Sequence, residues 1–351
     1  MTALKRQEQG TGTGRTTRPH RRQWRRVLVV AAGALALVLV GLAFLLRAPA
    51  PVGHWTSAAG RAHFMTAYRA AMRDMPPATA VRDVRTDFGF VRVYRYEGSA
   101  RRAEPLVLLP GRASASPVWA DDLPFLLGIG DVYTIDLLGE PGMSVQEAPI
   151  TSAADHAAWL DQVLERLPED SFHVIGLSVG GWTAANLAVH RPGRVATLTL
   201  IDPVYTFSEM PLGTAVRAIP ASVPWLPKSW RDSFNSYVAG GAPVQDVPIA
   251  DMIESGMRHY TLRLPQPTLL GRDALRGLRM PVLAILAGRS VVHDVATSRQ
   301  VAGSVLRNGT VVEYPDASHA INGEHPAEIA ADIAAFLNAH GRRSGPGDGS
   351  G

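Results

Sequence analysis

The stretch at 172–182 constrains the fold more than any other part of this chain. It begins as an apolar run suited to a β-strand and continues as Gly-Leu-Ser-Val-Gly at 176–180. An Ala- and Leu-rich segment suited to a helix follows at 183–190. The pattern predicts a strand, a sharp turn and a helix. The two glycines have no Cβ atoms to clash where strand and helix nearly touch, and the turn holds Ser178 at a strained backbone angle.

Short apolar runs alternate with helical segments from residue 106 onward. The predicted strands are 106–109, 132–135, 172–175, 198–201, 282–287 and 311–314, and the clearest helices between them are 152–167 and 178–190. Such alternation predicts an α/β fold with a mostly parallel central sheet that is flanked by helices. Ligands of these folds bind beyond the carboxyl ends of the strands, where Ser178 is expected.

The segments before and between these strands add three elements. Apolar residues recur every four residues in 56–73, which predicts an amphipathic helix. The stretches 81–85 and 90–96 alternate apolar and polar residues around a glycine, which predicts an antiparallel pair. Nine prolines interrupt the chain at 203–279, and nearly eighty residues without a strand are too long for a connection. We therefore expect a helical lid at 203–279, inserted into a core formed by 55–202 and 280–340.

The N-terminal region carries a membrane signal. Residues 1–26 hold eight Lys and Arg and one Glu, and we expect a disordered basic tail there. Twenty residues without a charge follow at 27–46. As a helix they would rise about 30 Å, the thickness of the hydrocarbon layer. The positive flank predicts a signal anchor with a cytoplasmic N-terminus and an extracytoplasmic catalytic domain. A linker at 47–54 would join the span to the core.

Two other interpretations of 27–46 remain open. The sequence Ala-Pro-Ala at 48–50 resembles a signal-peptidase site, so the domain could be secreted after cleavage. Pro51 beside the cut and the length of the apolar run favour an uncleaved anchor. A buried core helix is disfavoured by the basic flank.

Composition excludes several classes of function. The chain has no cysteine, which excludes disulfides, thiol catalysis and cysteine metal sites. The net charge is +4, but the first 26 residues carry +7 and the rest carries −3, so the folded part offers no nucleic-acid surface. We find no phosphate-binding loop, dinucleotide fingerprint or His-Glu-x-x-His motif, and expect no cofactor and no metal. The Gly- and Ser-rich end at 341–351 is expected to be disordered.

Four motifs carry a resemblance to a known family. They are Leu-Leu-Pro-Gly-Arg at 108–112, Asp-Leu-Leu-Gly-Glu-Pro-Gly-Met-Ser at 136–144, Gly-Leu-Ser-Val-Gly at 176–180 and Ser-His-Ala-Ile-Asn at 318–322. In order and spacing the chain from about 55 to 340 resembles the α/β-hydrolase superfamily, specifically a lidded, serine-dependent esterase-like member. The resemblance implies that Ser178 is the nucleophile and His319 its base, because the family places the base in the loop after the last strand. His293 and His325 are less suited to that role. A serine in a purely structural glycine turn is the alternative for Ser178.

The chain departs from the family at the acid. Relatives usually supply a carboxylate soon after the strand that ends here at Ala287, and the sequence at 288–291 has none. Asp202 ends the preceding strand, where some families such as haloalkane dehalogenases keep their acid, and Asp294 lies farther along the expected loop. Asp202 could instead only shape the entry to the lid, and Asp294 could only cap a helix. We favour Asp202 and keep Asp294 as the alternative.

The resemblance also implies an oxyanion hole made of two backbone amides, those of Val179 and Arg112. Relatives often have His-Gly where this chain has Pro-Gly at 110–111, an exchange that leaves backbone donors in place. The turn at 139–144 is expected to border the pocket.

These features predict a membrane-anchored serine hydrolase that cleaves a carboxylic ester through an acyl-enzyme. The substrate would be a small-molecule ester. The missing carboxylate and the Pro-Gly exchange leave two alternatives. One is a non-catalytic, anchored binding or sensing module on the same fold, and the other is a lyase- or peroxidase-like member.

Overall fold

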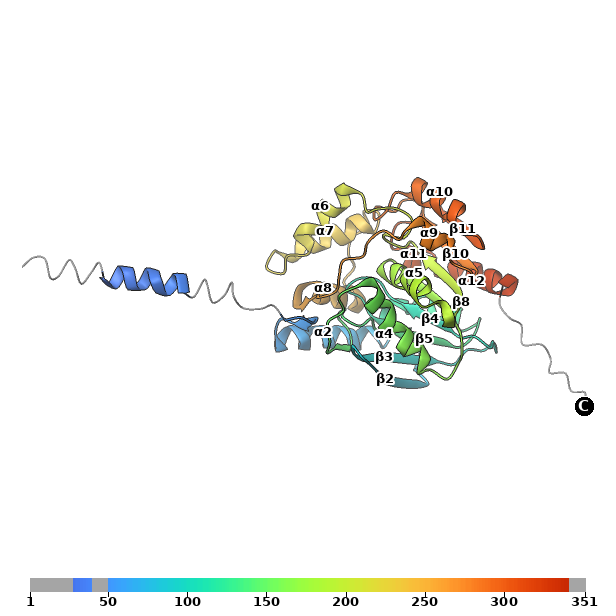
Figure 1. The fold of residues 1–351 in the computed structure, drawn as a ribbon, viewed down its shortest axis with the longest axis horizontal. Coiled ribbons are helices and arrows are strands. Elements are labelled where there is room, and N and C mark those ends of the chain that lie inside the picture. The colour runs from blue at the N-terminus through green and yellow to red at the C-terminus, as the bar shows by residue number, and fades with distance from the viewer. Residues whose placement is uncertain (1–27, 40–49, 341–351) are drawn as a thin grey trace, which may run out of the picture. The chain divides into compact units, whose positions relative to one another are not determined.

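The computed structural model of the protein describes residues 28–39 and 50–340 (Figure 1). The chain divides into two units, one up to Ala50 and one from Pro51 onward. Residues 28–39 are helical, and their side chains are exposed. Within the two described ranges, no helix is both long and apolar enough to cross a membrane. The predicted span at 27–46 begins and ends outside these ranges, and the predicted tails at 1–26 and 341–351 lie wholly outside them.

A nine-stranded sheet forms the centre of the unit that begins at Pro51. Its order is β11-β10-β8-β7-β4-β5-β3-β2, with β6 paired to β3. Strands β11 to β5 in this order are parallel, and β2 and β3 are antiparallel. The strands are β2 (Ala80–Thr86), β3 (Gly89–Tyr96), β4 (Leu106–Leu109), β5 (Val132–Ile135), β6 (Val145–Gln146), β7 (Phe172–Leu177), β8 (Val195–Ile201), β10 (Val282–Ala287) and β11 (Gly309–Tyr314).

The sheet confirms the predicted α/β class and its individual strands. The apolar runs at 106–109, 132–135 and 282–287 coincide with β4, β5 and β10, and every residue of these three strands is buried. The predicted antiparallel pair is the β2–β3 hairpin. The other three strands extend two or three residues beyond the predicted runs, at the end of β7 and at the starts of β8 and β11.

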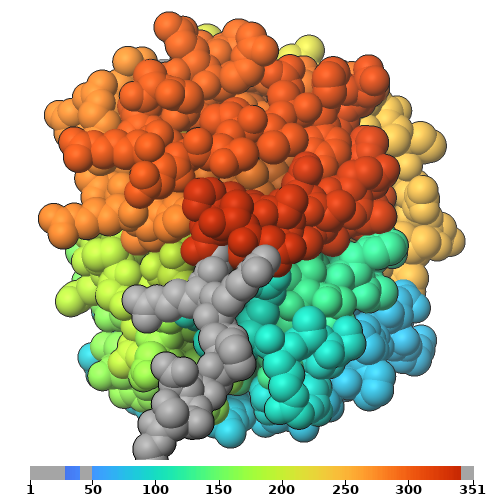
Figure 2. Space-filling model, turned by 90° about the vertical axis from the view of Figure 1, so that its right-hand side faces the viewer, coloured from blue at the N-terminus to red at the C-terminus, as the bar shows by residue number. Residues whose placement is uncertain are grey.

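Helices cover both faces of the sheet, so two apolar cores form. One core packs α4, α5 and α10 on one face, and the other packs α2, α3 and α12 on the opposite face. Figure 1 shows α4 and α5 across the nearer side of the sheet, and in Figure 2 the last part of the folded chain covers the upper half of the molecule. These helices are α2 (Ala58–Ala71), α3 (Leu123–Leu126), α4 (Ala153–Glu165), α5 (Val179–His190), α10 (Val295–Val305), α11 (Ile321–Glu324) and α12 (Pro326–His340), with short 3-10 turns at Ser116–Trp119 and Pro192–Arg194.

Local sequence explains where the helices begin. Ser152 caps α4 through a reciprocal pair of hydrogen bonds with Asp155, and Ser57 accepts from the Gly60 N–H at the start of α2. Each cap satisfies backbone donors that the first helical turn leaves free. Pro326 opens α12, where its missing N–H costs nothing.

The segment at 203–279 contains four helices and departs from expectation in one respect. The helices are α6 (Leu212–Ala221), α7 (Lys228–Val238), α8 (Pro248–His259) and α9 (Arg272–Arg276). We expected no strand here, but Tyr260–Thr261 forms β9, which pairs with β1 at His54–Trp55. A two-residue strand is too short to show alternation, and its partner lies some two hundred residues earlier. The pairing ties the end of α8 to the first residues of this unit.

Two buried histidines make the stability of the fold sensitive to acid. Burial lowers the pKa of His156 and of His173 to about 4. An unfolded chain takes up these protons near pH 6.5, whereas the folded protein stays neutral until about pH 4. Stability is therefore lost as the pH falls from about 6.5 to about 4.

The substitution His173→Asn tests this pH dependence. We expect the free energy of unfolding of the wild-type protein to drop by about 1 kcal/mol per buried histidine between pH 7 and pH 5.5. In the variant we expect the free energy of unfolding to drop by about 1 kcal/mol less between the two pH values. The variant also gives up the bond to Thr197, but this loss is the same at both pH values and cancels in the difference. Urea unfolding at the two pH values measures the difference. An equally steep dependence in the variant would contradict the assignment.

Candidate active site

Ser178 stands at the turn between β7 and α5 in a strained conformation. Its φ is 56° and its ψ is −116°, and it directly precedes the first residue of α5. A Cβ atom on Gly176 would lie 2.2 Å from the Gly180 carbonyl oxygen, and one on Gly180 would lie 2.2 Å from the Leu109 carbonyl oxygen. Only glycine fits at either position, as the sequence predicts. The turn thus fixes Ser178 at the carboxyl edge of the sheet.

His319 and Asp202 continue from Ser178 in a chain of hydrogen bonds. The distance from His319 Nε2 to Ser178 Oγ is 2.9 Å, and that from His319 Nδ1 to Asp202 Oδ2 is 2.6 Å. A carboxylate can only accept, so Nδ1 carries the proton and Nε2 is free to accept from the Ser178 hydroxyl. Asp202 directly follows β8 with a φ of 42°, and His319 lies in the loop between β11 and α11. The three side chains come from three separate parts of the chain.

Asp202 is buried and receives four hydrogen bonds. Oδ2 accepts from His319 Nδ1 and from Ser290 Oγ at 2.6 Å, and Oδ1 accepts from the Ala287 N–H at 2.9 Å and from His293 Nε2 at 2.6 Å. Burial alone would raise the pKa of this carboxyl, but the bonds to His293 and His319 and their charges outweigh it and hold the pKa well below its usual value. Asp202 is therefore an ionised carboxylate with its lone pairs filled.

His293 is the partner that the sequence did not suggest. We considered it only as a weak alternative to His319 as the base, and the structure instead places it on the far side of Asp202, itself buried. Burial alone would lower its pKa, but the hydrogen bond to Asp202 and the charge of that carboxylate raise it. Its Nδ1 has no hydrogen-bond partner among the described residues. A histidine soon after a strand that lacks the expected carboxylate was the available signal.

The other two candidates lie elsewhere. Asp294 caps α10 by accepting from the Thr297 N–H at 2.7 Å, and its side chain has no hydrogen bond to His319 in the described part of the chain. His325 lies between α11 and α12 with its ring 5.2 Å from that of Tyr314. The structure thus joins Asp202, and neither Asp294 nor His325, to Ser178 and His319.

The loop at 110–113 approaches Ser178 from β4. A Cβ atom on Gly111 would lie 3.5 Å from Ser178 Cβ, so the loop backbone passes directly beside the hydroxyl. Val179 is the first residue of α5, where backbone N–H groups have no partner within the helix. No hydrogen bond within the described ranges uses the Arg112 N–H. Both amides expected to form the oxyanion hole thus lie in segments that flank Ser178.

Glu140 holds this loop from the turn at 139–144. Its Oε2 accepts from the Ala113 N–H at 3.1 Å, and its Oε1 lies 3.3 Å from Arg112 Nη1. That second contact is an ion pair without hydrogen-bond geometry. Burial raises the pKa of Glu140, and the Arg112 guanidinium opposes the shift. Asp136 organises the start of the same turn by accepting from the Met143 N–H at 2.8 Å.

Ser178 and His319 are largely buried, and the connection between α7 and α8 lies beside the loop that carries His319. Ser178 is only 9% exposed, and the His319 side chain is 11% exposed. Gly240, between α7 and α8, lies so close to Ser318 that an added Cβ would be 3.0 Å from the Ser318 Cβ. Arg289 Nη2 donates to the Gly240 carbonyl oxygen at 3.0 Å. The connection between α7 and α8 thus rests beside His319.

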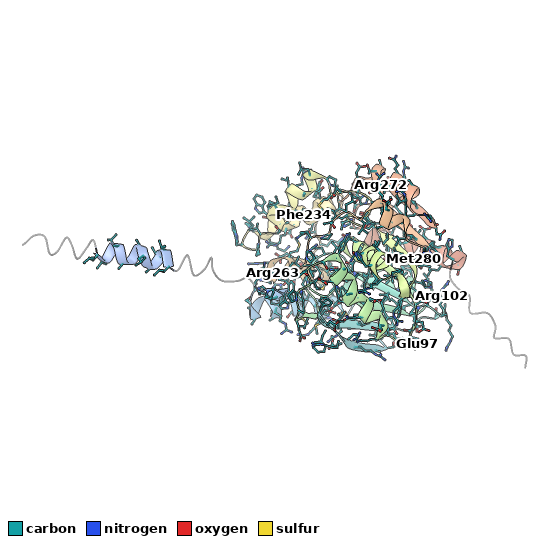
Figure 3. The ribbon with its side chains drawn as sticks, viewed as in Figure 1. Glu97, Arg102, Phe234, Arg263, Arg272 and Met280 are labelled. Carbon is teal, nitrogen blue, oxygen red and sulfur yellow. The ribbon has the colours of Figure 1, made fainter. Side chains whose placement is uncertain are left out.

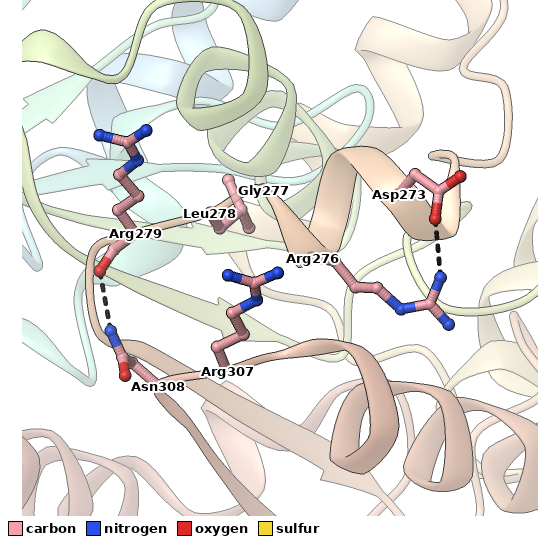
Figure 4. Close-up of a pocket in the computed structure, with 7 residues that line it drawn as sticks. All are labelled: Asp273, Arg276, Gly277, Leu278, Arg279, Arg307 and Asn308. Carbon is pink, nitrogen blue, oxygen red and sulfur yellow. Dashed lines mark hydrogen bonds and ion pairs between the residues drawn. The ribbon is translucent and has the colours of Figure 1, made fainter.

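Two surface hollows lie at the edge of the sheet where the parallel strands begin, opposite the edge that carries Ser178. One has a volume of about 700 Å³ and is lined by α9, the residues before β10, and Arg307 and Asn308 (Figure 4). The other, of about 590 Å³, includes Glu104 and His173. Both lie toward the amino ends of strands, whereas Asp202 contacts the carboxyl end of β10. Neither contains Ser178 or His319. In the described ranges no group of three His, Asp or Glu side chains could hold a metal ion.

Comparisons with known proteins agree with this geometry. A family model described as alpha/beta hydrolase fold matches residues 104–241. The "Uncharacterized carboxylesterase nap" of Bacillus subtilis is 26% identical over 68% of this chain and 80% of its own length. "Monoacylglycerol lipase ABHD6" of Bos taurus is 25% identical over 89% of this chain and 94% of its own length. The solved carboxylesterase CesB (YbfK) from Bacillus subtilis is 20% identical, has a TM-score of 0.73, and covers 80% of this chain and 99% of that one.

The order of the sheet, the strained serine after β7 and these matches lead to the same assignment. The chain belongs to the α/β-hydrolase superfamily and is a carboxylesterase-like member of it.

Proposed function

We propose that the protein is a serine hydrolase that cleaves carboxylic esters with Ser178 as nucleophile, His319 as general base and acid, and Asp202 as the carboxylate. The hydrogen-bond chain from Ser178 Oγ through His319 to Asp202 carries the proposal. Similarity to carboxylesterases and to a monoacylglycerol lipase supports an ester as the substrate.

The steps follow from the positions of the three side chains. Ser178 Oγ attacks the ester carbonyl carbon while His319 Nε2 takes its proton, and the amides of Val179 and Arg112 stabilise the oxyanion. The carbonyl re-forms, the bond to the alkoxy oxygen breaks, and His319 gives the proton to the departing alcohol. Water then attacks the acyl-enzyme with His319 as base, and the carboxylic acid and free Ser178 are released. Asp202 stabilises the imidazolium in both halves.

Two measurements on the full chain test this function. A fluorophosphonate should label the protein at Ser178 with one equivalent bound, and short-chain p-nitrophenyl esters should turn over with a burst of one equivalent of nitrophenol. Folded protein that neither labels nor turns over any of several acyl esters would favour a non-catalytic binding module. Labelling without ester turnover would favour lyase- or peroxidase-like chemistry. The binding alternative rests on the missing carboxylate after β10 and on the Pro-Gly exchange at 110–111, and Asp202 within 2.6 Å of His319 supports the enzyme over the binding module on the first of these two points.

We propose in addition that residues 27–46 anchor the enzyme, with the N-terminus in the cytoplasm and the domain from Pro51 outside. The basic residues before the span and its length support this topology. The core at 55–202 and 280–340, the lid at 203–279 and the linker at 47–54 complete the proposed domain plan. Flotation of the full chain with membranes after an alkaline carbonate wash tests the anchor. Release into the supernatant as a chain that begins near Pro51 would favour signal cleavage.

His293 acts in this scheme as a positioning residue for Asp202. It fills Oδ1, so the carboxylate cannot rotate away from His319. When protonated it also places a positive charge on the far side of Asp202 from His319.

The substitution His293→Gln tests that role. We expect kcat to fall about 10-fold, because the amide keeps a donor with poorer geometry. We also expect the KM for a soluble ester to stay within about 2-fold, because His293 contacts Asp202 and not the substrate in the proposed mechanism. Steady-state kinetics on that ester give both quantities. An unchanged kcat in the folded variant would contradict the positioning role, and a higher KM with kcat unchanged would assign His293 to substrate binding instead.

A further inference from the structure

Helix α6 of the lid exposes an apolar face. Leu212, Val216 and Ile219 are spaced by four and three residues, so they project from the same side of the helix. They are 79%, 55% and 61% exposed. Water-soluble domains seldom leave such a stripe uncovered, and contiguous apolar surface indicates an interaction site.

Two tryptophans extend this face. Trp225, in the connection between α6 and α7, is 83% exposed, and Trp230, in the first turn of α7, is 50% exposed. Indole rings combine a large apolar area with one N–H donor, which suits them to the boundary between lipid and water. We call Leu212, Val216, Ile219, Trp225 and Trp230 the lid face.

Cations outnumber carboxylates in the sequence beside the lid face. Between Glu209 and Asp232 the sequence has no carboxylate, and its cations are Arg217, Lys228 and Arg231. Arg231 is buried against Glu254, and Lys228 pairs with Asp232 at 2.7 Å, so among the described residues Arg217 is the cation of this stretch without a carboxylate partner. An apolar face with a cation at its border complements a bilayer that contains anionic lipid.

The lid face belongs to the side of this unit at which the N-terminal segment enters. The buried pair of Arg231 and Glu254, with nitrogen–oxygen distances of 2.9 and 2.6 Å, ties α7 to α8. The end of α8 continues into β9, which pairs with β1 at His54–Trp55. In Figure 1 the α6–α7 hairpin and the start of this unit both lie at its left-hand edge.

Few residues join the proposed anchor to the start of this unit. The predicted span ends at Leu46 and the folded unit begins at Pro51. The four residues between them reach at most about 14 Å when extended. If residues 27–46 span a membrane, this length limits how far Pro51 can lie from the end of the span.

We propose that the lid face lies in the headgroup region of an anionic bilayer and that the enzyme takes its ester substrates from that bilayer. The proposal rests on the proposed ester hydrolysis and anchoring and assigns a substrate class, acyl esters dissolved in a membrane. The connection that follows α7 lies against Ser318, the neighbour of His319, and is bonded to Arg289, so a membrane contact on α6 and α7 would act on a segment beside the base.

The absence of cysteine from the sequence allows a direct test with single labels. A nitroxide is attached to the cysteine of the Trp225→Cys variant of the full chain. The labelled protein is then mixed with phosphatidylcholine vesicles that contain 30% phosphatidylglycerol. Glu97→Cys is the matched control, because Glu97 is exposed and lies at the opposite edge from Phe234 of α7 (Figure 3). We expect the label at 225 to be accessible to oxygen and protected from a water-soluble nickel chelate, and the label at 97 to show the reverse.

Other results at position 225 would overturn the proposal. A label as accessible to the nickel chelate as the one at 97 would place the lid face in water, whether or not the chain is anchored. Spin–spin broadening that grows with protein concentration, without protection by lipid, would assign the lid face to contact between two copies of this chain.

A kinetic test separates the lid face from the active site. In Leu212→Glu/Ile219→Glu we expect turnover of a long-chain ester in the same vesicles to fall at least 10-fold, and turnover of a soluble short-chain ester to stay within about 2-fold. An equal loss on both substrates, or on neither, would contradict the membrane role. If the wild-type protein hydrolyses neither ester, the proposed function fails, and the label at 225 still decides the membrane contact.

Discussion

Replacement of Ser178 by alanine is expected to abolish ester hydrolysis and leave a folded protein. The change removes the atom that would form the acyl-enzyme, and loss of a catalytic serine lowers kcat by about four to six orders of magnitude in enzymes of this kind. Fluorophosphonate labelling should disappear with it. Alanine fits the space of serine, but it meets the same strain at a φ of 56°, so thermal stability should change by less than about 1 kcal/mol.

A matched control is available beside the active site. Ser290 donates to Asp202, the carboxylate that His319 also contacts, but it does not attack the substrate carbon in the proposed mechanism. Ser290→Ala should reduce kcat far less than Ser178→Ala and should still be labelled. Residual hydrolysis and labelling in Ser178→Ala near the wild-type level would end the case for this serine.

Replacement of Asp202 by asparagine has the second largest expected effect. The side chain would lose its charge and turn an amide nitrogen toward donors, because all four groups around Asp202 donate. We expect kcat to fall by about four orders of magnitude, because His319 loses the partner that fixes its tautomer. We also expect a loss of about 2–4 kcal/mol of stability from donors left without an acceptor.

Asp294→Asn serves as the control for Asp202→Asn. Asparagine caps a helix about as well as aspartate, so α10 should lose well under 1 kcal/mol and the activity should stay within about 2-fold. Hydrolysis of a soluble ester and thermal unfolding of the two variants measure both effects. If Asp294→Asn abolished activity and Asp202→Asn did not, the carboxylate assignment would be reversed.

Protonation of Asp202 should also appear as a loss of stability of the wild-type protein at low pH. The pKa of Asp202 is lowered in the folded state, so its contribution is present above the unfolded value near pH 4 and is lost as the pH falls below it. This loss adds to that of His156 and His173 at higher pH and extends the acid sensitivity of the fold downward.

The sequence was most informative where one local rule acts alone. Gly176 needed no tertiary information, because its close contact with Gly180 is a property of the turn itself, whereas the constraint on Gly180 comes from Leu109 at the end of β4. The buried strands β4, β5 and β10 were equally clear, since all of their residues except Thr134 belong to hydrophobic residue types. Ser178 and His319 could be paired in advance only through the resemblance to a family.

The interactions that sequence could not supply are those between distant segments. The choice between Asp202 and Asp294 depends on how β8 and β10 end beside each other, which no local pattern records. His293 is a loop residue with no periodicity, and its contact with Asp202 spans 91 positions. Glu140 and β9 are similar cases, since each acts on a partner far along the chain.

The position of Asp202 at the end of β8 has a consequence for how such enzymes are recognised. The loop at 288–293 supplies two donors, from Ser290 and His293, in place of an acid. A search that requires an acidic residue after β10 would classify chains of this type as inactive pseudoenzymes. A rule that accepts a serine and a histidine there, together with an aspartate one strand earlier, would recover them.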